Sequence, residues 1–254
     1  MWSIFKKPSF LTASFAAFLI CCFPIKLHAS TISSVGSPNV EKGRLTAEIR
    51  QGYSLDNEDD GQGGQDQRLR SRFHVDYGLT DYYAPRVVVS TDRRKGGSLE
   101  FDTLTFENRF QFLKQKTAPL DFGIRLGYSL RDGDKKPDRT YINLYERKDV
   151  GEWQFRANQL FSHDIGEDAG DGISAELRLQ ATYEISEKVE LGLESFNDFG
   201  NLAEQSGYSS QQHSVGPVIK AGFGDGYGLE TGYRTGISEG ALDHSFRIFL
   251  SKTF

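Results

Sequence analysis

The chain has 254 residues, a formal net charge of −5, 37% hydrophobic residues and a mean hydropathy of −0.49. An acidic balance of this kind disfavours nucleic-acid binding, which needs a basic surface. The low apolar content leaves little material for a large solid core. With 27 Gly, 19 Phe and 11 Tyr, however, the composition suits a barrel whose apolar side chains all point outward.

Residues 1–29 have the pattern of a cleavable secretory signal peptide. Lys6 and Lys7 precede an apolar run over 10–23, and the expected cleavage site follows the small residue Ala29. The run is shorter than the roughly 20 residues that a transmembrane helix needs. Cleavage would remove three lysines and no acidic residue, so the charge of −5 would become −8. It would also remove both cysteines, so no disulfide or zinc site is expected in the exported domain, residues 30–254.

From residue 44 onward, apolar and polar residues alternate in segments of about ten residues, as in 120–128 and 176–183. Such alternation places one face of a strand in lipid and the other in water. We predict twelve strands at 44–54, 67–77, 83–92, 98–112, 119–130, 139–148, 152–162, 172–184, 189–197, 211–223, 226–237 and 244–254. Ten is the alternative count, because 98–112 and 139–148 have an ambiguous phase.

The connections between these segments alternate in length. Those at 55–66, 131–138, 163–171, 198–210 and 238–243 are long and mostly acidic, and the others are mostly turns of a few residues. Outer-membrane barrels pair long external loops with short periplasmic turns in this way. The last segment ends at Phe254 in phase with Leu250, Ile248 and Phe246, which resembles the C-terminal signal that outer-membrane proteins present to the barrel-assembly machinery.

These patterns predict an all-β fold, a transmembrane antiparallel up-and-down β-barrel in the cell outer membrane. The sheet must close because every backbone polar group in lipid has to be paired. The expected partners are outer-membrane lipids and lipopolysaccharide, with the barrel-assembly machinery acting during insertion. The alternative is an open β-sandwich in the periplasm.

If the apolar phase faces outward, the opposite phase fills the lumen with arginine. The predicted channel-lining residues are Arg50, Arg68, Arg70, Arg72, Arg109, Arg125, Arg156, Arg178, Arg234 and Arg247. One interpretation is that they pair with inward acids and fill a narrow barrel. The other is that they line a water-filled path for anions, because guanidinium groups bind carboxylates and phosphates bidentately. The run Arg68, Arg70, Arg72 favours the second, since three like charges on one face repel unless anions or acids meet them.

Two stretches carry a resemblance to a known family. Residues 47–53, which read Ala-Glu-Ile-Arg-Gln-Gly-Tyr, precede an acidic loop and an arginine-bearing second strand, and Ser245-Phe246-Arg247 opens a terminal strand that ends in Phe. Together they resemble the small twelve-stranded oligogalacturonate-specific porins. The resemblance implies passive uptake of small anionic solutes without a cofactor. Residues 192–200 and 213–217 have no counterpart in that family, so the resemblance does not identify the substrate of this chain.

The sequence offers no catalytic group. The pairs His213-Ser214, His244-Ser245 and Ser162-His163 are adjacent, so on a strand their side chains point to opposite faces and make no dyad. A calcium-like loop that begins at Asp56 has Gln67 where the bidentate Glu should stand, so no metal site is predicted. The acidic loops either share divalent cations with lipopolysaccharide phosphates or are simply solvated. The alternatives to a channel are a non-conducting structural envelope barrel and a lipid- or peptide-hydrolysing enzyme.

Overall fold

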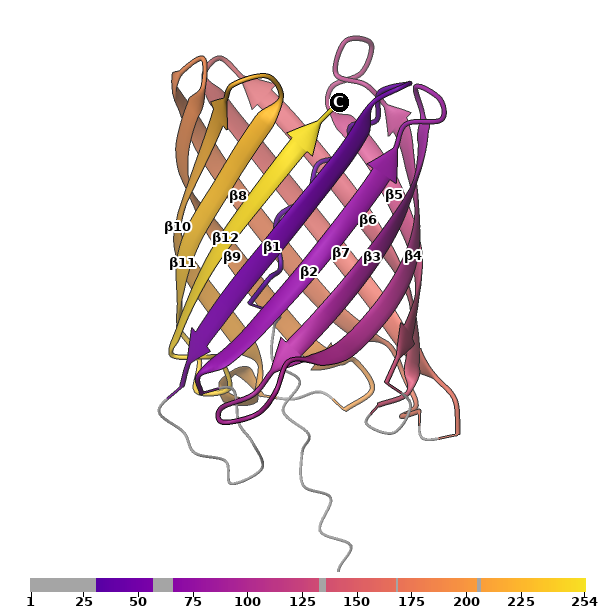
Figure 1. Ribbon diagram of the computed structural model, residues 1–254, viewed down its shortest axis with the longest axis vertical. Coiled ribbons are helices and arrows are strands. Elements are labelled where there is room, and N and C mark those ends of the chain that lie inside the picture. The colour runs from indigo at the N-terminus through magenta and orange to yellow at the C-terminus, as the bar shows by residue number, and fades with distance from the viewer. Residues whose placement is uncertain (1–30, 57–65, 133–135, 168, 205–206) are drawn as a thin grey trace, which may run out of the picture.

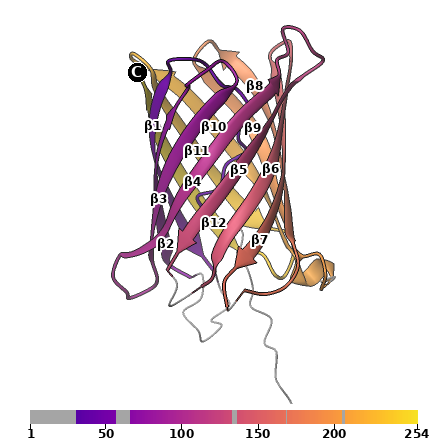
Figure 2. The ribbon, with the colours of Figure 1, turned by 90° about the vertical axis from the view of Figure 1, so that its right-hand side faces the viewer.

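The computed structural model describes residues 31–56, 66–132, 136–167, 169–204 and 207–254. The expected signal peptide lies outside these ranges. The described chain forms one closed antiparallel barrel of twelve strands, which confirms the predicted fold and count (Figures 1 and 2). The strands are β1 (Leu45–Leu55), β2 (Arg68–Tyr77), β3 (Tyr83–Arg93), β4 (Glu100–Leu113), β5 (Asp121–Arg131), β6 (Asp138–Val150), β7 (Trp153–Ile165), β8 (Ser174–Ser186), β9 (Val189–Asn201), β10 (Gln212–Phe223), β11 (Tyr227–Gly236) and β12 (His244–Thr253).

Each strand pairs with its neighbours in sequence, and β1 closes the barrel by pairing with β12. In that closing ladder Ile49 lies opposite Leu250 and Tyr53 lies opposite Phe246. The in-phase apolar residues of the terminal strand therefore meet those of the first strand on the same face. Closure leaves no free sheet edge, which is the state that a lipid environment requires.

The two ends of the barrel differ in their connections. Turns at 78–82, 114–120, 151–152, 187–188 and 224–226 make up what we call the short-turn end, where β1 begins and β12 ends. The longer connections gather at the opposite, long-loop end, where one carries the short 3-10 helix η1 (Tyr208–Ser210). In the 151–152 turn Gly151 has a φ of 58°, a left-handed conformation that glycine adopts without strain. Within the described ranges no helix has the length and apolar character to cross a bilayer.

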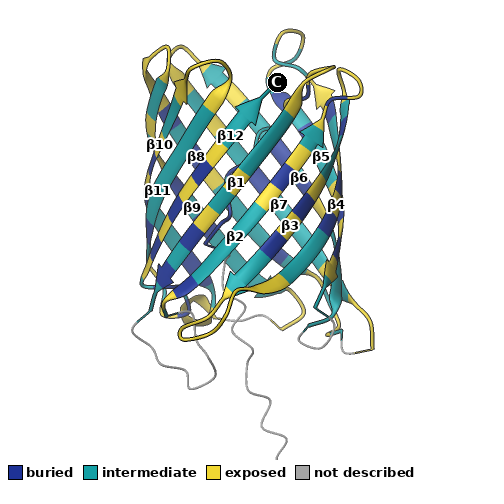
Figure 3. Cartoon of the chain, viewed as in Figure 1, coloured by how far each residue is buried: buried dark blue, intermediate teal, exposed yellow. Residues whose placement is uncertain are grey.

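The outer wall is apolar. Alternate residues such as Phe73, Val87 and Ile248 are 48%, 44% and 50% exposed, and Figure 3 shows exposed and buried positions alternating along the strands. Aromatic rings gather near the short-turn end, where Trp153 and Tyr183 lie 5.1 Å apart and Phe223 and Tyr227 lie 5.6 Å apart. An apolar band bordered by aromatic rings matches the hydrocarbon core and its interface.

A β-bulge explains the ambiguous phase of 98–112. Ser90 lies opposite Thr103 but Thr91 lies opposite Phe101, so Asp102 is an extra residue in β4. Phe101 and Leu104 consequently both face outward although they are three residues apart. In β6 the ambiguity has another cause, because Tyr141 turns inward and donates to Glu107 Oε1 at 2.6 Å. Both segments are complete strands.

Strand spacing at β10 and β11 gives a test of closure. A Cβ at Gly216 would overlap the carbonyl oxygen of Tyr233, whereas a Cβ at Gly222 has open space around it. We expect Gly216→Val to destabilise the barrel by at least about 2 kcal/mol, because backbone must shift to admit the side chain. Gly222→Val is the matched control. The measurement is the fraction of refolded chain that migrates as the compact species in unboiled detergent gels, and equal fractions for both variants would contradict this packing.

Candidate functional site

The inward faces of the strands enclose a lumen, and all ten arginines proposed as lining residues point into it. They come from β1, β2, β4, β5, β7, β8, β11 and β12, so the positive groups surround the barrel axis. Each guanidinium contacts a group on another inward position or on the chain that lies inside the barrel.

Inward acids meet most of these arginines. The pairs are Arg50–Glu48 at 2.5 Å, Arg68–Asp92 at 2.6 Å, Arg70–Asp92 at 3.8 Å, Arg109–Asp76 at 3.0 Å, Arg125–Glu107 at 3.5 Å, Arg178–Glu176 at 2.6 Å and Arg247–Glu230 at 2.9 Å. Within the Arg68, Arg70, Arg72 run, Asp92 of β3 pairs with the first two arginines, and Arg72 donates to Ser90 instead. Arg68 and Arg70 therefore do not by themselves require a bound anion.

The central level of the lumen is packed rather than open. The Arg247 and Glu194 side chains form an ion pair and are 1% and 0% exposed. Phe196 from β9 is fully buried beside them, with the Arg234 guanidinium 4.0 Å above its ring. On β12 the ring of Phe249 lies 4.5 Å from the guanidinium of Arg50. Inward aromatic rings thus serve as cation–π partners for several arginines.

The chain that precedes β1 lies inside the barrel. We call residues 31–40 the N-terminal segment; in Figures 1 and 2 the described chain before β1 runs as an indigo trace within the strands. Thr31, Ile32 and Val35 are only 2%, 2% and 1% exposed. The sequence analysis missed this placement. The segment reads TISSVGSPNV, with no charge and no strand or helix period, so nothing in it distinguishes a lumen-bound peptide from a free terminus.

Arginines donate to the backbone carbonyls of the N-terminal segment along its length. The hydrogen bonds are Arg234 to Thr31 O at 3.1 Å, Arg50 to Ile32 O at 3.5 Å, Arg178 to Ser34 O at 3.2 Å, Arg156 to Val35 O at 3.3 Å, and Arg109 to Ser37 O and Asn39 O at 3.4 and 3.0 Å. These side chains satisfy carbonyls that buried backbone must otherwise leave unpaired.

Two side-chain amides form hydrogen bonds with backbone groups of the same segment. Asn158 of β7 accepts from Gly36 N at 2.6 Å and donates to Gly36 O at 3.1 Å, so one side chain satisfies both polar groups of one residue. Gln111 of β4 accepts from Val40 N at 2.9 Å. The lumen therefore contacts an extended peptide through its backbone.

Glycines in the wall make room for the segment. A Cβ at Gly52 of β1 would lie 2.7 Å from Thr31 Oγ1, and one at Gly123 of β5 would lie 2.9 Å from Pro38 Cβ. Both distances are closer than side-chain carbons tolerate. The absence of side chains at these two positions lets the peptide lie against the strand backbone.

Two lumen cations have no acid within ion-pair distance in the part of the chain that the structure describes. Arg72 donates from Nε to Ser90 Oγ at 3.1 Å, and Arg156 donates to Val35 O. A guanidinium held only by neutral acceptors is not neutralised by a direct ion pair, so it can still bind an anion. These two residues are the strongest candidates for contact with an anionic solute.

At the long-loop end, acidic residues have basic partners. Asp164 accepts from Arg131 at 3.0 Å and from Arg139 at 2.6 Å. Lys95 donates to Asp66 at 2.8 Å, and this hydrogen bond holds the pKa of Asp66 below its usual value. No group of three or more residues suited to hold a metal occurs in the described ranges. Residues 57–65 of the calcium-like loop lie outside them.

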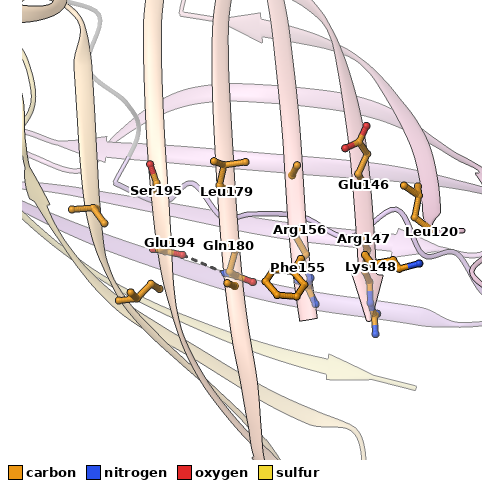
Figure 4. A pocket seen from close by; sticks show the side chains of 14 residues that line it. Leu120, Glu146, Arg147, Lys148, Phe155, Arg156, Leu179, Gln180, Glu194 and Ser195 are labelled. Atoms are coloured by element: carbon orange, nitrogen blue, oxygen red, sulfur yellow. Dashed lines mark hydrogen bonds between the residues drawn. The ribbon is translucent and has the colours of Figure 1, made fainter. Parts of the chain in front are cut away.

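The hollow shown in Figure 4, of about 450 Å³, lies on the outer wall and not in the lumen. The hollow exists because the outward side chains of Ala157 and Ala181 are small. The larger side chains of Phe155, Leu179 and Leu193 border it. Since these residues share the membrane-facing phase, the hollow is no part of a path through the barrel.

The histidine rings bond to groups other than serine hydroxyls. His163 Nδ1 lies 2.7 Å from Gly172 O, and His244 Nδ1 lies 2.8 Å from the Tyr233 hydroxyl. His213 lies between Asn197 Oδ1 and Gln211 Oε1 at 3.0 and 2.9 Å. None of these contacts has the His–Ser geometry that activates a nucleophile.

Comparison with known proteins gives similarity in structure alone. No protein-family model and no curated protein sequence matches the chain. The COG4313 outer membrane channel from Pseudomonas putida F1 superposes with a TM-score of 0.66 at 12% identity, covering 87% of this chain and 100% of that one. The KdgM porin in complex with disordered oligogalacturonate gives 0.59 at 7%, covering 82% and 99%. The NanC porin gives 0.58 at 10%, covering 82% and 100%.

The chain has the fold of these barrels. The identities are too low to carry more than the fold, and fold alone does not establish function. The similarity does agree with the family resemblance read from residues 47–53 and the terminal strand. Nearly the whole of each of the three structures aligns with this barrel.

The buried pair at the centre gives a stability prediction. We expect Arg247→Leu to cost about 3 kcal/mol or more, because it leaves the fully buried Glu194 carboxylate without its cation. The double variant Arg247→Leu with Glu194→Leu should recover much of that loss. Urea unfolding of the barrel in lipid vesicles measures both. Exposed Lys95→Ala is the control and should leave the midpoint unchanged. A single variant as stable as the parent chain would contradict the packed centre.

Proposed function

We propose that the protein is an outer-membrane channel for passive diffusion of small anionic solutes. The observation that carries the proposal is the arginine-lined lumen inside a closed barrel with an apolar outer wall. The ten proposed arginines come from eight of the twelve strands, and Arg72 and Arg156 have no acid partner among the described residues. Such groups attract carboxylate and phosphate through charge and bidentate geometry.

The membrane assignment is part of the proposal. The short-turn end would face the periplasm and the long-loop end the exterior, following the usual rule for bacterial barrels. Residues 1–29 would direct export and be cleaved. Outer-membrane lipids, lipopolysaccharide and the barrel-assembly machinery would be the partners in the envelope.

The solute class is drawn from two sources. The surplus of lumen cations favours anions over neutral molecules, and a structurally similar barrel, the KdgM porin, is described in complex with oligogalacturonate. We therefore propose short acidic oligosaccharides as the class to test first. The alternative, a structural envelope barrel, is favoured by the packed central level with Phe196 and the N-terminal segment.

Ion selectivity tests the role of the unpaired arginines. We expect Arg72→Gln with Arg156→Gln to shift the reversal potential in a salt gradient toward cations, because two lumen charges are lost. The net-neutral control is Arg147→Gln with Asp149→Asn, a pair 2.7 Å apart that turns inward near the short-turn end. Planar-bilayer recordings of the refolded chain give the potential. Equal reversal potentials in both double variants would contradict an anion path.

Solute flux tests the substrate class directly. We expect proteoliposomes containing the protein to take up trigalacturonate faster than neutral maltotriose. The two sugars are similar in size, but only the carboxylates of trigalacturonate can pair with the lumen cations. The measurement is the initial rate of liposome swelling with each sugar. Equal rates would remove the acidic preference, and no swelling with either would favour the structural barrel.

A further inference from the structure

The position of the N-terminal segment bears on how the lumen is closed. In the barrel order β1 and β8 stand on nearly opposite walls, separated by five steps in one direction and seven in the other. Ser34 is held from both walls. Arg50 of β1 donates to Ser34 Oγ at 2.7 Å, and Arg178 of β8 donates to Ser34 O at 3.2 Å. A residue clamped between opposite walls fills the lumen at its level.

The segment continues this contact along the axis. Thr31 lies beside Gly52, toward the long-loop end of β1, and Val40 bonds to Gln111, near the short-turn end of β4. Between them Gly36 is bound by Asn158 of β7. The segment therefore extends over much of the lumen and contacts strands on every side. While the segment is in place, it takes up lumen space that a passing solute would need.

The hydrogen bonds that hold the segment can be replaced by hydrogen bonds to an anionic solute. Residues 31–40 carry no charge, so every guanidinium that holds them binds a neutral carbonyl or hydroxyl. A carboxylate adds its own negative charge and a second oxygen, so it pairs with a guanidinium bidentately, which a single carbonyl cannot do. A carboxylate in the lumen would therefore compete for the same arginines.

A turn connects the segment to the wall. Gly43, just before β1, has a φ of 81°, a left-handed conformation that glycine adopts without strain, and its N–H donates to Gly78 O at 2.8 Å. The segment is thus tethered to β1 at the short-turn end, beyond residues 41–42, and held elsewhere by side chains of the lumen.

We propose that residues 31–40 are a tethered plug which occupies the anion-binding arginines and leaves when an acidic solute takes them. This inference rests on the proposed channel function and adds its regulation. The segment stands in for the solute, since its carbonyls occupy the guanidiniums that a row of carboxylates would bind. The closed state is the one seen here, and a displaced segment gives the conducting state.

Single-channel recording of the chain from residue 30 onward tests the plug. Gly52→Val places a side chain where Thr31 lies and changes no charge, so it should expel the segment and raise the mean current on the order of threefold or more as the blocked fraction falls. Gly222→Val is the matched control, because its Cβ meets open space, and it should leave the current unchanged. A Gly52→Val current equal to that of the control would overturn the plug.

A deletion keeps the test valid if Gly52→Val does not fold. Removing residues 31–40 should give a steady open channel, and a synthetic peptide of those ten residues should then block it, whereas a scrambled peptide of the same composition should not. A deletion variant that conducts like the full chain, or that the native peptide does not block, overturns the proposal.

The same recordings separate the plug from the channel function. The sign of the reversal potential in the deletion variant reports anion selectivity without the segment. An open, anion-selective deletion variant supports both proposals. Equal currents in full chain and deletion, with anion selectivity in both, overturn the plug alone. A current increase without anion selectivity supports the plug and overturns the anion path.

Discussion

Backbone hydrogen bonding in lipid is the constraint on which this structure depends. A sheet in hydrocarbon has no water to satisfy its edge, so the ladder between β1 and β12 must form for any other strand to be stable there. Closure then sorts side chains by phase: one set faces lipid and must be apolar, and the other faces inward and is free to be charged. The arginine lumen is a consequence of that sorting, and so is the low overall hydrophobic content.

The same requirement for paired polar groups shapes the interior. Charged side chains inside a narrow barrel must find partners, and this chain supplies two kinds. Acids on the same strand or on nearby strands pair with seven of the ten proposed arginines, as Asp92 does with Arg68. The N-terminal segment takes others through its carbonyls, and aromatic rings such as Phe196 supply faces for guanidinium groups. Ion pairing and the proposed anion attraction are therefore not exclusive interpretations of the lumen, because Arg72 and Arg156 stand outside the ion pairs of the described residues.

The lumen has the properties of a site that recognises extended chains. Its donors are distributed along the axis, it has two amides that contact peptide groups, and Gly52 and Gly123 leave space for a backbone to lie flat. A linear acidic oligosaccharide shares the extended shape and adds charge that the segment lacks. This shared geometry is why the proposed closure by residues 31–40 and the proposed passage of an acidic chain could use one set of side chains.

The sequence by itself determined where the strands lie and, outside 98–112 and 139–148, which side each residue faces, because a period of two along a membrane strand is a local property. It predicted twelve strands and left ten as the alternative count. It left the phase of 98–112 open, since a bulge at Asp102 depends on which strand lies alongside. It also left residues 31–40 without a place. Their location was decided only by the tertiary structure, because an uncharged, aperiodic peptide acquires its position from partners such as Asn158 and Arg178, which lie far away in the chain and come together only when the barrel closes.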